Sequence, residues 1–325
     1  MKAMKDQMLS TQEPLVWVDG KLIPSVNATL NVMSAAVRYG LNVFEGICGY
    51  TNGTCSDLFI FRLRDHVERL QASARIMRLD CDYPAAILEK AVLETVQVNN
   101  TMYDCQFRLT IFVSGRGDCA TRGPTSLMCV VTPRISRNLN ERAVTAGIAS
   151  WRRIADDVMP ARVKAGANYL NGRYGLLEAK ASGFDEAIFL TREGKVAEAS
   201  SACLFMIRNG VLLTPPLTAS ILESITRETI IKLAKEHLKI EVQTREIDRT
   251  ELYLAEELFI CGSHYEITPV VELDGFRVGK GIPGPISQSL WDGYDKLVRG
   301  KIDLSSNHSN GWCVSAHRKT DNQPD

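Results

Sequence analysis

Apolar side chains recur along this chain at two spacings, and each spacing predicts a different kind of element. Between residues 65 and 78 they recur every three or four positions, which predicts an amphipathic helix. The face of this helix consists of Val67, Leu70, Ala74 and Met77. Residues 105–113 alternate instead, as a half-buried β-strand does. The two faces of that strand consist of Gln106, Arg108 and Thr110, and of Phe107, Leu109 and Ile111.

Residues typical of helix starts, helix ends and tight turns predict further elements. Pro84 predicts the first position of a second helix, which runs to about Val98. A strand is expected over residues 143–150, and a helix from about Asn168 to just before Gly183. One face of the latter helix consists of Leu170, Tyr174, Leu177 and Ala181. Two dipeptides between apolar runs predict two-residue hairpins, namely Asn209-Gly210 and Asp274-Gly275.

Strands and helices alternate along the chain, which indicates a mixed α/β (α+β) fold of two domains with a ligand between them. The chain has 325 residues, enough for two substantial cores. The polar residues 134–142 are expected to connect a smaller domain, 14–133, to a larger domain, 143–301. Residues 1–13 and 302–325 are polar and aperiodic, so we expect a flexible N-terminus and a disordered tail.

Composition narrows the class of protein. The chain carries 38 basic and 38 acidic residues, a balance that speaks against nucleic-acid or anionic-membrane partners. No apolar stretch approaches the roughly 20 residues that a membrane-spanning helix needs. The first residues lack the apolar segment of a secretory signal, so a cytoplasmic protein is expected.

Cysteine and histidine give no sign of a metal centre. The nine cysteines are scattered and form no Cys-x-x-Cys pair, so we expect reduced, mainly structural thiols. His66 and His237 stand in charged helical segments, away from any metal-ligand spacing. The expectation is therefore a protein without a bound metal.

Lys164 is the first candidate for chemistry. It stands in Ala161-Arg162-Val163-Lys164-Ala165-Gly166-Ala167-Asn168-Tyr169-Leu170, where its nearest neighbours are small and apolar. Such neighbours supply no counter-charge, and packing around the amine favours its neutral, nucleophilic form. On spacing alone, an exposed residue at a helix start is the leading interpretation. A second candidate follows further on, where Glu198 stands in Gly194-Lys195-Val196-Ala197-Glu198-Ala199-Ser200-Ser201.

These two motifs, in this order, resemble the active site of the fold type IV (class IV) pyridoxal-phosphate aminotransferases, the branched-chain aminotransferases in particular. The resemblance covers nearly the whole chain, and further motifs occur in the order of the family. They are Val16-Trp17-Val18-Asp19-Gly20, Arg38-Tyr39-Gly40-Leu41-Asn42-Val43-Phe44-Glu45-Gly46, Phe61-Arg62-Leu63-Arg64-Asp65-His66-Val67-Glu68-Arg69-Leu70, Ser224-Ile225-Thr226-Arg227 and Glu266-Ile267-Thr268-Pro269-Val270. The resemblance implies a two-domain enzyme with the cofactor between the domains.

The resemblance assigns the cofactor-binding residues. Lys164 bonds covalently to pyridoxal 5′-phosphate and, once displaced, carries the proton between the substrate Cα and the cofactor. Glu198 faces the pyridine nitrogen and keeps a proton on the ring, which makes the ring a better electron acceptor. Tyr169 hydrogen-bonds the phenolic oxygen of the cofactor. The phosphate is assigned to Arg69, to the amides of Ile225 and Thr226, and to the hydroxyl of Ser263.

Two positions at the phosphate site differ from the family pattern, and one assigned residue has a simpler interpretation. Ser224 stands where the family commonly has glycine, but a serine can cap the helix that follows. Ser263 stands where relatives often carry threonine, so a hydroxyl is kept. Without the resemblance, Arg69 would be interpreted as a helix residue paired with Asp65.

The substrate side resembles the branched-chain enzymes less closely. Common bacterial members have Tyr-x-Arg where this chain has Gln106-Phe107-Arg108. Arg108 implies glutamate or 2-oxoglutarate as one substrate, whereas Gln106 replaces the tyrosine that helps to fix the substrate carboxylate. Tyr39 and Phe44 match the aromatic walls of the pocket, and His264 is assigned to the substrate side.

The resemblance therefore implies transamination between an apolar, branched-chain type L-amino acid and 2-oxoglutarate, by a homodimer or higher homo-oligomer. Gln106, together with Arg116 and Arg122 in the following loop, leaves related activities open. These are a D-amino acid or (R)-amine transaminase and an enzyme similar to aminodeoxychorismate lyase. A non-catalytic binding homologue is the remote alternative, against which retention of the whole cofactor-binding set argues.

Overall fold

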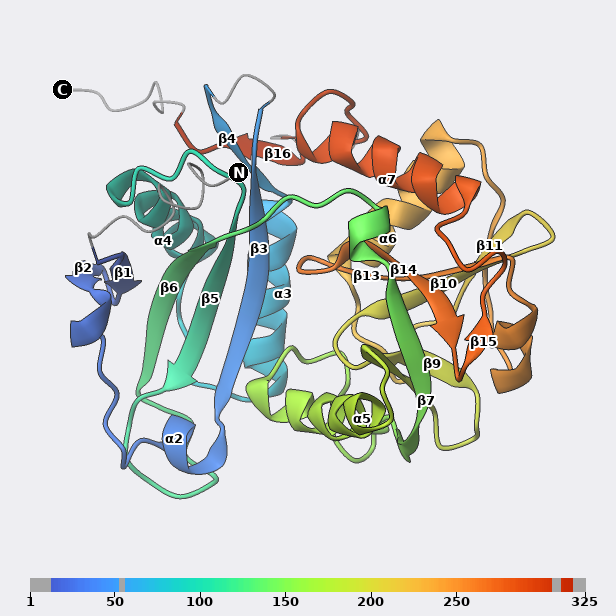
Figure 1. Cartoon of the computed structure of the whole chain (residues 1–325). Helices are drawn as coiled ribbons and strands as arrows, with labels where there is room; N and C mark the ends of the chain where they lie inside the picture. Colours follow the sequence, from blue (N-terminus) through green and yellow to red (C-terminus); the bar gives the residue numbers. More distant parts are fainter. Residues whose placement is uncertain (1–12, 53–55, 306–310, 318–325) are drawn as a thin grey trace. The chain divides into compact units, whose positions relative to one another are not determined.

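The computed structural model of the protein describes residues 13–52, 56–305 and 311–317. The chain divides into two compact units (Figure 1). The first comprises residues up to Ser136 together with those from Val298 onward, and the second comprises Arg137–Leu297. The division thus falls inside the predicted connector, whereas the second unit ends four residues before the expected position 301. Of the predicted flexible N-terminus, residues 1–12 lie outside the described residues.

The first unit contains a seven-stranded antiparallel sheet with the order β16-β4-β3-β5-β6-β1-β2. Its strands are β1 (Leu15–Val18), β2 (Lys21–Pro24), β3 (Asn42–Thr51), β4 (Leu58–Phe61), β5 (Cys105–Val113), β6 (Thr125–Pro133) and β16 (Cys313–Ser315). Its helices are η1 (Ser25–Asn27), α2 (Ala35–Tyr39), α3 (Leu63–Ile76) and α4 (Ala85–Val98). The predicted strand at 105–113 and the predicted helix at 65–78 are therefore confirmed. Pro84 caps α4 rather than occupying its first position.

Helices α3 and α4 cover one face of this sheet and lie behind it in Figure 1. The alternation along β5 explains why: Phe107, Leu109 and Ile111 are fully buried, whereas Arg108 between them is exposed. On the neighbouring strand β3, Glu45 shares the helix-covered face, because it pairs with Leu109 in the antiparallel register. The opposite face of the same two strands carries three of the predicted substrate-binding residues, Phe44, Gln106 and Arg108.

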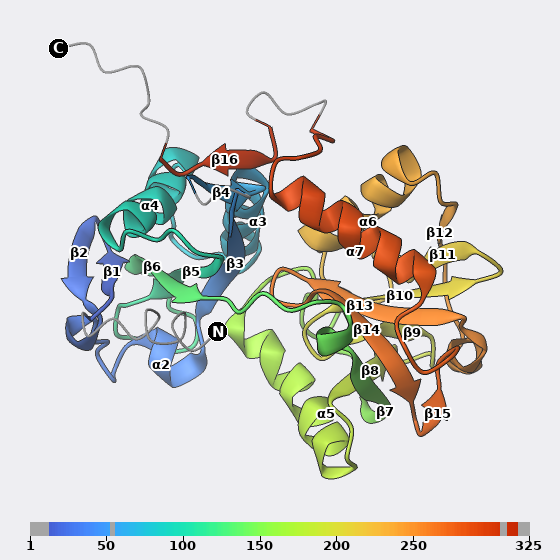
Figure 2. The ribbon, with the colours of Figure 1, turned by 45° about the horizontal axis from the view of Figure 1, so that its top comes forward.

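The expectation of a disordered tail was wrong for residues 313–315, which form β16 at the edge of the first sheet. Val314 pairs with Ile60 on β4, as the neighbouring strands in Figure 2 show. Just before β16, the buried Trp312 ring lies 4.5 Å from the Arg62 guanidinium and meets Phe61 edge-on. Tertiary contacts therefore order a polar segment that has no local signal of its own.

The second unit is built on a mixed nine-stranded sheet. Along the order β12-β11-β10-β13-β14-β7-β8-β9, three neighbouring pairs are parallel: β12 with β11, β14 with β7, and β7 with β8. Its strands are β7 (Val144–Arg152), β8 (Glu186–Leu190), β9 (Val196–Ala199), β10 (Cys203–Arg208), β11 (Val211–Thr214), β12 (Val242–Thr244), β13 (Glu257–Gly262), β14 (Glu266–Leu273) and β15 (Phe276–Arg277). Its helical segments are η2 (Asn140–Arg142), η3 (Gly166–Asn168), α5 (Tyr169–Ala181), α6 (Ile225–Lys232), η4 (Leu233–His237), η5 (Arg249–Leu254) and α7 (Pro285–Val298).

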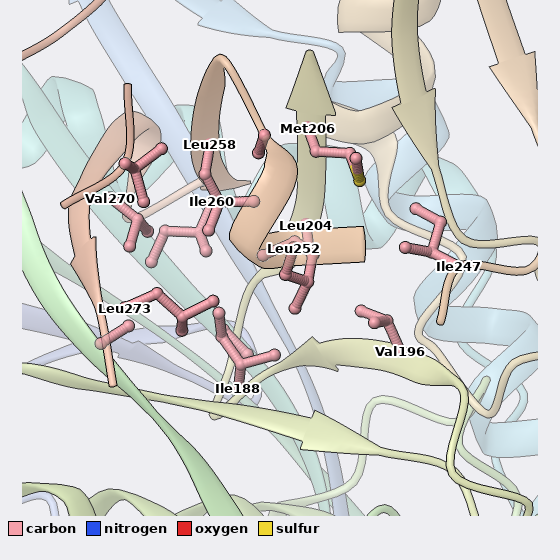
Figure 3. Packing of buried hydrophobic residues seen from close by; sticks show 14 of the residues in the cluster. Ile188, Val196, Leu204, Met206, Ile247, Leu252, Leu258, Ile260, Val270 and Leu273 are labelled. Carbon is pink, nitrogen blue, oxygen red and sulfur yellow. The ribbon is translucent and has the colours of Figure 1, made fainter. Parts of the chain in front are cut away.

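The apolar core of the second unit lies on the inner side of this curved sheet. Because β9 also packs against β10, the sheet curls around a shared apolar interior. Side chains from distant parts of the chain meet there, among them Ile188, Leu204, Leu258 and Val270 (Figure 3). Both predicted hairpins occur: Asn209-Gly210 joins β10 to β11, and Asp274-Gly275 joins β14 to β15, with positive φ throughout. Among the described residues, no helix is long and apolar enough to cross a membrane.

Helix α5 packs on β7 and β8 through glycines rather than through its apolar face. A Cβ atom at Gly172 would lie 2.0 Å from the Ser200 carbonyl oxygen, and one at Gly175 would lie 2.2 Å from the Phe189 ring. The face predicted from helical spacing points the other way. Leu170, Tyr174, Leu177 and Ala181 are all exposed. Close backbone approach therefore overrides the apolar periodicity that normally marks a buried helix face.

Candidate functional site

Lys164 lies in the segment between β7 and α5, and its amine contacts the first residue of that helix. The Lys164 Nζ donates a hydrogen bond of 2.7 Å to the Tyr169 hydroxyl. Asn168 shapes the segment, because its amide nitrogen donates to the carbonyls of Pro160 and Val163. Val163 and Ala165 on either side of the lysine are buried, and Lys164 itself is half-buried. The apolar setting that the motif predicts is therefore present.

Glu198 lies on β9 and is buried, with 3% of its surface exposed. One carboxylate oxygen is 2.7 Å from the Nη2 of Arg153. The other accepts hydrogen bonds from the Leu222 amide at 3.2 Å and, more weakly, from the Cys203 thiol at 3.8 Å. Burial raises the pKa of Glu198, while Arg153, the Leu222 amide and Lys164 act in the opposite direction. Glu198 is therefore a buried, partnered acid rather than a surface one.

Two residues separate Leu222 from Ile225, where helix α6 begins. Ser224 caps this helix, because its hydroxyl accepts a hydrogen bond of 3.2 Å from the Arg227 amide. Ile225 and Thr226 are the first two helical residues, and both are buried. Their amides lie at the positive end of the helix dipole, where an anion is stabilised. The serine thus preserves the helix start that the sequence predicts.

Ser263 and His264 lie in the turn between β13 and β14. The next residue, Tyr265, packs edge-on against the His264 ring at 5.5 Å between ring centroids. Its hydroxyl donates a 2.7 Å hydrogen bond to the buried Glu186 and lies 3.2 Å from the Ser201 hydroxyl. Burial and the Glu186 carboxylate raise the pKa of Tyr265 to about 12, so this phenol stays protonated. These contacts of Tyr265 therefore fix the C-terminal end of the turn between β13 and β14.

The second unit joins these predicted residues into one network. Lys164 contacts Tyr169 directly and acts electrostatically on Glu198. The bond from Leu222 connects Glu198 to the segment that leads into α6. The contact between Ser201 and Tyr265 connects the segment after β9 to the β13–β14 turn. An amine, a phenol, a buried carboxylate, a helix start and a hydroxyl-bearing turn are thus linked within a single unit.

Arg69 lies in the first unit, on α3, where it pairs with Glu45. Its Nε and Nη2 donate to the two Glu45 oxygens at 2.7 Å each, and His66 contacts the same carboxylate at 2.7 Å. Asp65 pairs instead with Arg62. Burial disfavours the ionised form of Glu45, but Arg69 and His66 outweigh it and lower the pKa to about 2. The helix places Arg69 and His66 three positions apart, so both reach one acid.

Phe44, Gln106 and Arg108 lie together on the face of the first sheet opposite α3. Gly46 pairs with Arg108 across β3 and β5, so Phe44, two residues earlier, shares that face. The Arg108 guanidinium stacks over the Phe44 ring at 3.5 Å from its centroid. The Gln106 amide lies 3.0 Å from where a Cβ atom at position 46 would be. Tyr39 is the last residue of α2, and the Arg38 guanidinium lies over its ring at 5.0 Å from the centroid.

Comparison with known proteins defines the family. Residues 42–273 match the family described as Amino-transferase class IV. A probable branched-chain-amino-acid aminotransferase of Aquifex aeolicus (strain VF5) is 36% identical over 286 residues, which cover 87% of this chain and 92% of the relative. The chain belongs to the class IV aminotransferases.

Solved structures of this aminotransferase family have the same fold. The branched-chain aminotransferase of Thermoproteus uzoniensis, crystallised with norvaline, is 40% identical with a TM-score of 0.87, covering 94% of this chain and 100% of that one. The branched-chain amino acid aminotransferase of Thermobaculum terrenum in its PLP-form is 37% identical with a TM-score of 0.87, covering 95% and 100%. The expected mixed fold and class IV membership are thus confirmed.

Sequence reasoning missed residues of this aminotransferase that hold the predicted ones in place. Arg153 follows β7 without any motif, and only the fold brings it to Glu198. Glu45 carries a usable signal, since an acid amid apolar residues of a strand requires a partner when it is buried. His66 is one of the residues dismissed as uninformative, yet it is buried against that acid. In each case, the residue that was missed is the partner of a buried charged side chain.

Proposed function

We propose that this aminotransferase binds pyridoxal 5′-phosphate in its second unit and moves the amino group between branched-chain L-amino acids and 2-oxoglutarate. The observation that carries the proposal is the pair of contacts around Lys164 and Glu198. The Lys164 amine is hydrogen-bonded to the Tyr169 phenol, and its charge lowers the pKa of the buried Glu198 carboxylate. That carboxylate is also paired with Arg153. The names of the related enzymes support the branched-chain substrate and, through the structure in the PLP-form, the cofactor.

The donor set of the second unit fits this cofactor. Lys164 would hold its aldehyde carbon covalently, Tyr169 its phenolic oxygen and Glu198 its ring nitrogen. The amides of Ile225 and Thr226 and the hydroxyl of Ser263 would hold the phosphate, since a capped helix start suits an anion. Arg69 is proposed for the same phosphate on the match of its motif to the family.

When bound, the cofactor accepts the electron pair released as the substrate Cα loses its proton. Lys164 Nζ removes that proton, and the Tyr169 hydroxyl at 2.7 Å holds the amine in a defined direction. Glu198 holds a proton at the ring nitrogen, which requires an ionised carboxylate facing that atom. The buried setting strengthens this interaction, because little water competes for the carboxylate.

A panel of amino donors and acceptors on purified protein tests the proposal. With added pyridoxal phosphate, leucine, isoleucine and valine should transfer their amino group to 2-oxoglutarate, measured as glutamate formed. D-alanine and (R)-phenylethylamine should react far more slowly. Preference for either of these would establish one of the related activities that Gln106 leaves open. Cofactor binding without any turnover would instead favour the non-catalytic homologue.

Arg108→Ala should raise the Michaelis constants for glutamate and 2-oxoglutarate about tenfold or more, with a much smaller change for leucine. Only the acidic substrates present a second carboxylate, and a planar guanidinium can bind it through two parallel hydrogen bonds. Leaving that charge unpaired costs roughly 1–3 kcal/mol. The measurement is steady-state kinetics with each substrate varied in turn.

Arg108→Lys is the matched control for this prediction, because it keeps the charge and loses the fork geometry. It should fall between the wild type and Arg108→Ala. Equal losses for acidic and apolar substrates would place Arg108 on the α-carboxylate instead. Unchanged constants for every substrate would remove Arg108 from the substrate site.

We further propose that the protein is a homodimer whose interface includes the exposed apolar face of α5. Leu170 and Tyr174 are 58% and 53% exposed, and the Trp151 ring stacks on Tyr174 at 4.9 Å. Exposed apolar patches of this kind mark interaction sites, and a second copy offers the same face in a symmetric pair. A cytoplasmic location, expected from the sequence, stays a prediction.

The combined change Leu170→Arg and Tyr174→Arg should convert the dimer to a monomer in analytical ultracentrifugation, because two buried guanidinium groups per chain would lack partners. Leu254→Arg is the control, since Leu254 is similarly exposed (61%) but lies on η5. A double variant that sediments like the wild-type dimer would place the interface elsewhere. A monomeric wild type would refute the dimer itself.

A further inference from the structure

Arg153 directly follows β7, and residues from three other segments of the chain hold its side chain. Its Nη2 contacts Glu198 on β9 at 2.7 Å, and its Nη1 donates to Asn171 on α5 at 3.2 Å. Its Nε donates to the carbonyl of Ser220, in the segment before α6, at 3.3 Å. Only 8% of the residue is exposed. A planar guanidinium with all three nitrogens engaged has a fixed position and orientation.

The electrostatics around Glu198 show what this arginine contributes. The titratable groups that face the carboxylate are Arg153 after β7, Lys164 before α5, Cys203 on β10 and Cys261 on β13. A carboxylate this deeply buried is costly to ionise unless a partner compensates for the lost water. Among the groups that lower the pKa of Glu198 against the effect of burial, Arg153 contributes most. Lys164 contributes less.

The geometry points to Arg153 as a positioning residue that acts through Glu198, keeping this carboxylate ionised and directed at the ring nitrogen of the cofactor. This inference rests on the proposed function, which assigns Glu198 to that nitrogen. Arg153 touches neither reacting atoms nor, on this assignment, the cofactor. Its link to Ser220 also braces the segment whose Leu222 amide holds the second carboxylate oxygen. Both oxygens of Glu198 therefore depend on the same arginine.

A first test uses the protein without cofactor and follows its stability against pH. The folded-state pKa of Glu198 is raised, so its contribution to stability is present below the unfolded pKa and is lost as pH rises through the folded value. Arg153→Met removes the largest opposing group and should raise that pKa further. The variant should therefore lose more stability at about pH 8 than at about pH 5. Each further pKa unit should multiply the unfolding constant at the higher pH about tenfold.

Two further variants make this result decisive. Adding Glu198→Gln to Arg153→Met removes the buried charge, so the pH-dependent part of the loss should disappear. Arg152→Met changes the adjacent exposed arginine and should behave like the wild type. The inference is overturned if Arg153→Met loses the same stability at both pH values and adding Glu198→Gln restores none of it. Arg153 would then only hold the neighbouring segments together.

The second test is a double-mutant cycle on the holoenzyme. Arg153→Met should raise the dissociation constant of pyridoxal phosphate about tenfold and change the visible absorbance of the bound cofactor, as Glu198→Gln is also expected to do. In the Glu198→Gln background, Arg153→Met should add almost nothing. Arg153→Lys, which keeps the charge, should recover part of the affinity. Additive effects would show that Arg153 acts independently of Glu198 and would overturn the inference.

The two tests separate this inference from the proposed function. If the wild type fails to bind pyridoxal phosphate, the proposed function fails, and the role of Arg153 in directing Glu198 at the cofactor fails with it. The pH-dependent coupling between Arg153 and Glu198 would still be measured in the cofactor-free protein. If the wild type binds and turns over while the cycle is additive, only the role of Arg153 fails.

Discussion

Lys164→Ala is expected to abolish transamination, with turnover at least about a thousandfold lower, and to remove the visible absorbance that depends on the covalent link to the cofactor. The amine is both the attachment point and the base that removes the substrate proton, and a methyl group can do neither. The hydroxyl of Tyr169, bonded to the amine at 2.7 Å, is a phenol and offers no replacement amine. Glutamate formation and an absorbance spectrum measure the two effects.

The fold should persist in Lys164→Ala, because the side chain is only half-buried and the Asn168 hydrogen bonds that shape its segment do not involve it. A change in stability of at most about 1 kcal/mol is expected. Lys180→Ala, at the exposed end of α5, is the matched control and should retain full activity. Normal turnover by Lys164→Ala would refute the assignment of this lysine and with it the proposed chemistry.

Glu198→Gln should lower turnover by about a hundredfold or more, whereas the affinity for pyridoxal phosphate should fall only about tenfold. An amide has the shape of the carboxylate but cannot hold a proton on the ring nitrogen. The loss of electron withdrawal during proton removal should cost about 3 kcal/mol or more of transition-state stabilisation. Single-turnover kinetics with leucine separate this step from cofactor binding.

Glu193→Gln is the control for this change, because Glu193 is an exposed acid in the connection between β8 and β9, the strand that carries Glu198. It should leave turnover unchanged. If Glu198→Gln also left turnover unchanged, Glu198 would serve only to pair with Arg153, and the match of its motif to the family would carry no catalytic meaning.

Local rules predicted much of this fold. The strand at 105–113 has the predicted bounds because its alternation matches the period of a half-buried strand. The Asn209-Gly210 turn was predictable because both residues accept the positive φ angles that a tight hairpin requires. Beside Lys164, the apolar neighbours Val163 and Ala165 are buried, as their apolar character predicts. Each of these features depends on residues close together in the sequence.

Features that depend on distant residues were not predictable in the same way. Strand β16 exists because Trp312 packs on Phe61 and Arg62, about 250 residues away in the chain. Without the resemblance, helical spacing pairs Arg69 with Asp65, whereas the fold supplies Glu45 from a strand. Helical periodicity located α5 but gave the wrong buried face, because nothing in the spacing reports how closely two backbones approach.

The glycine contact of α5 has a consequence for anyone who builds variant libraries to change the amino donor. The oxygen 2.0 Å from a would-be Cβ at Gly172 belongs to Ser200, two residues after Glu198. Even alanine at position 172 must therefore push the helix that begins at Tyr169 away from the strand segment that carries Glu198. Screens that randomise this helix should therefore recover glycine at position 172.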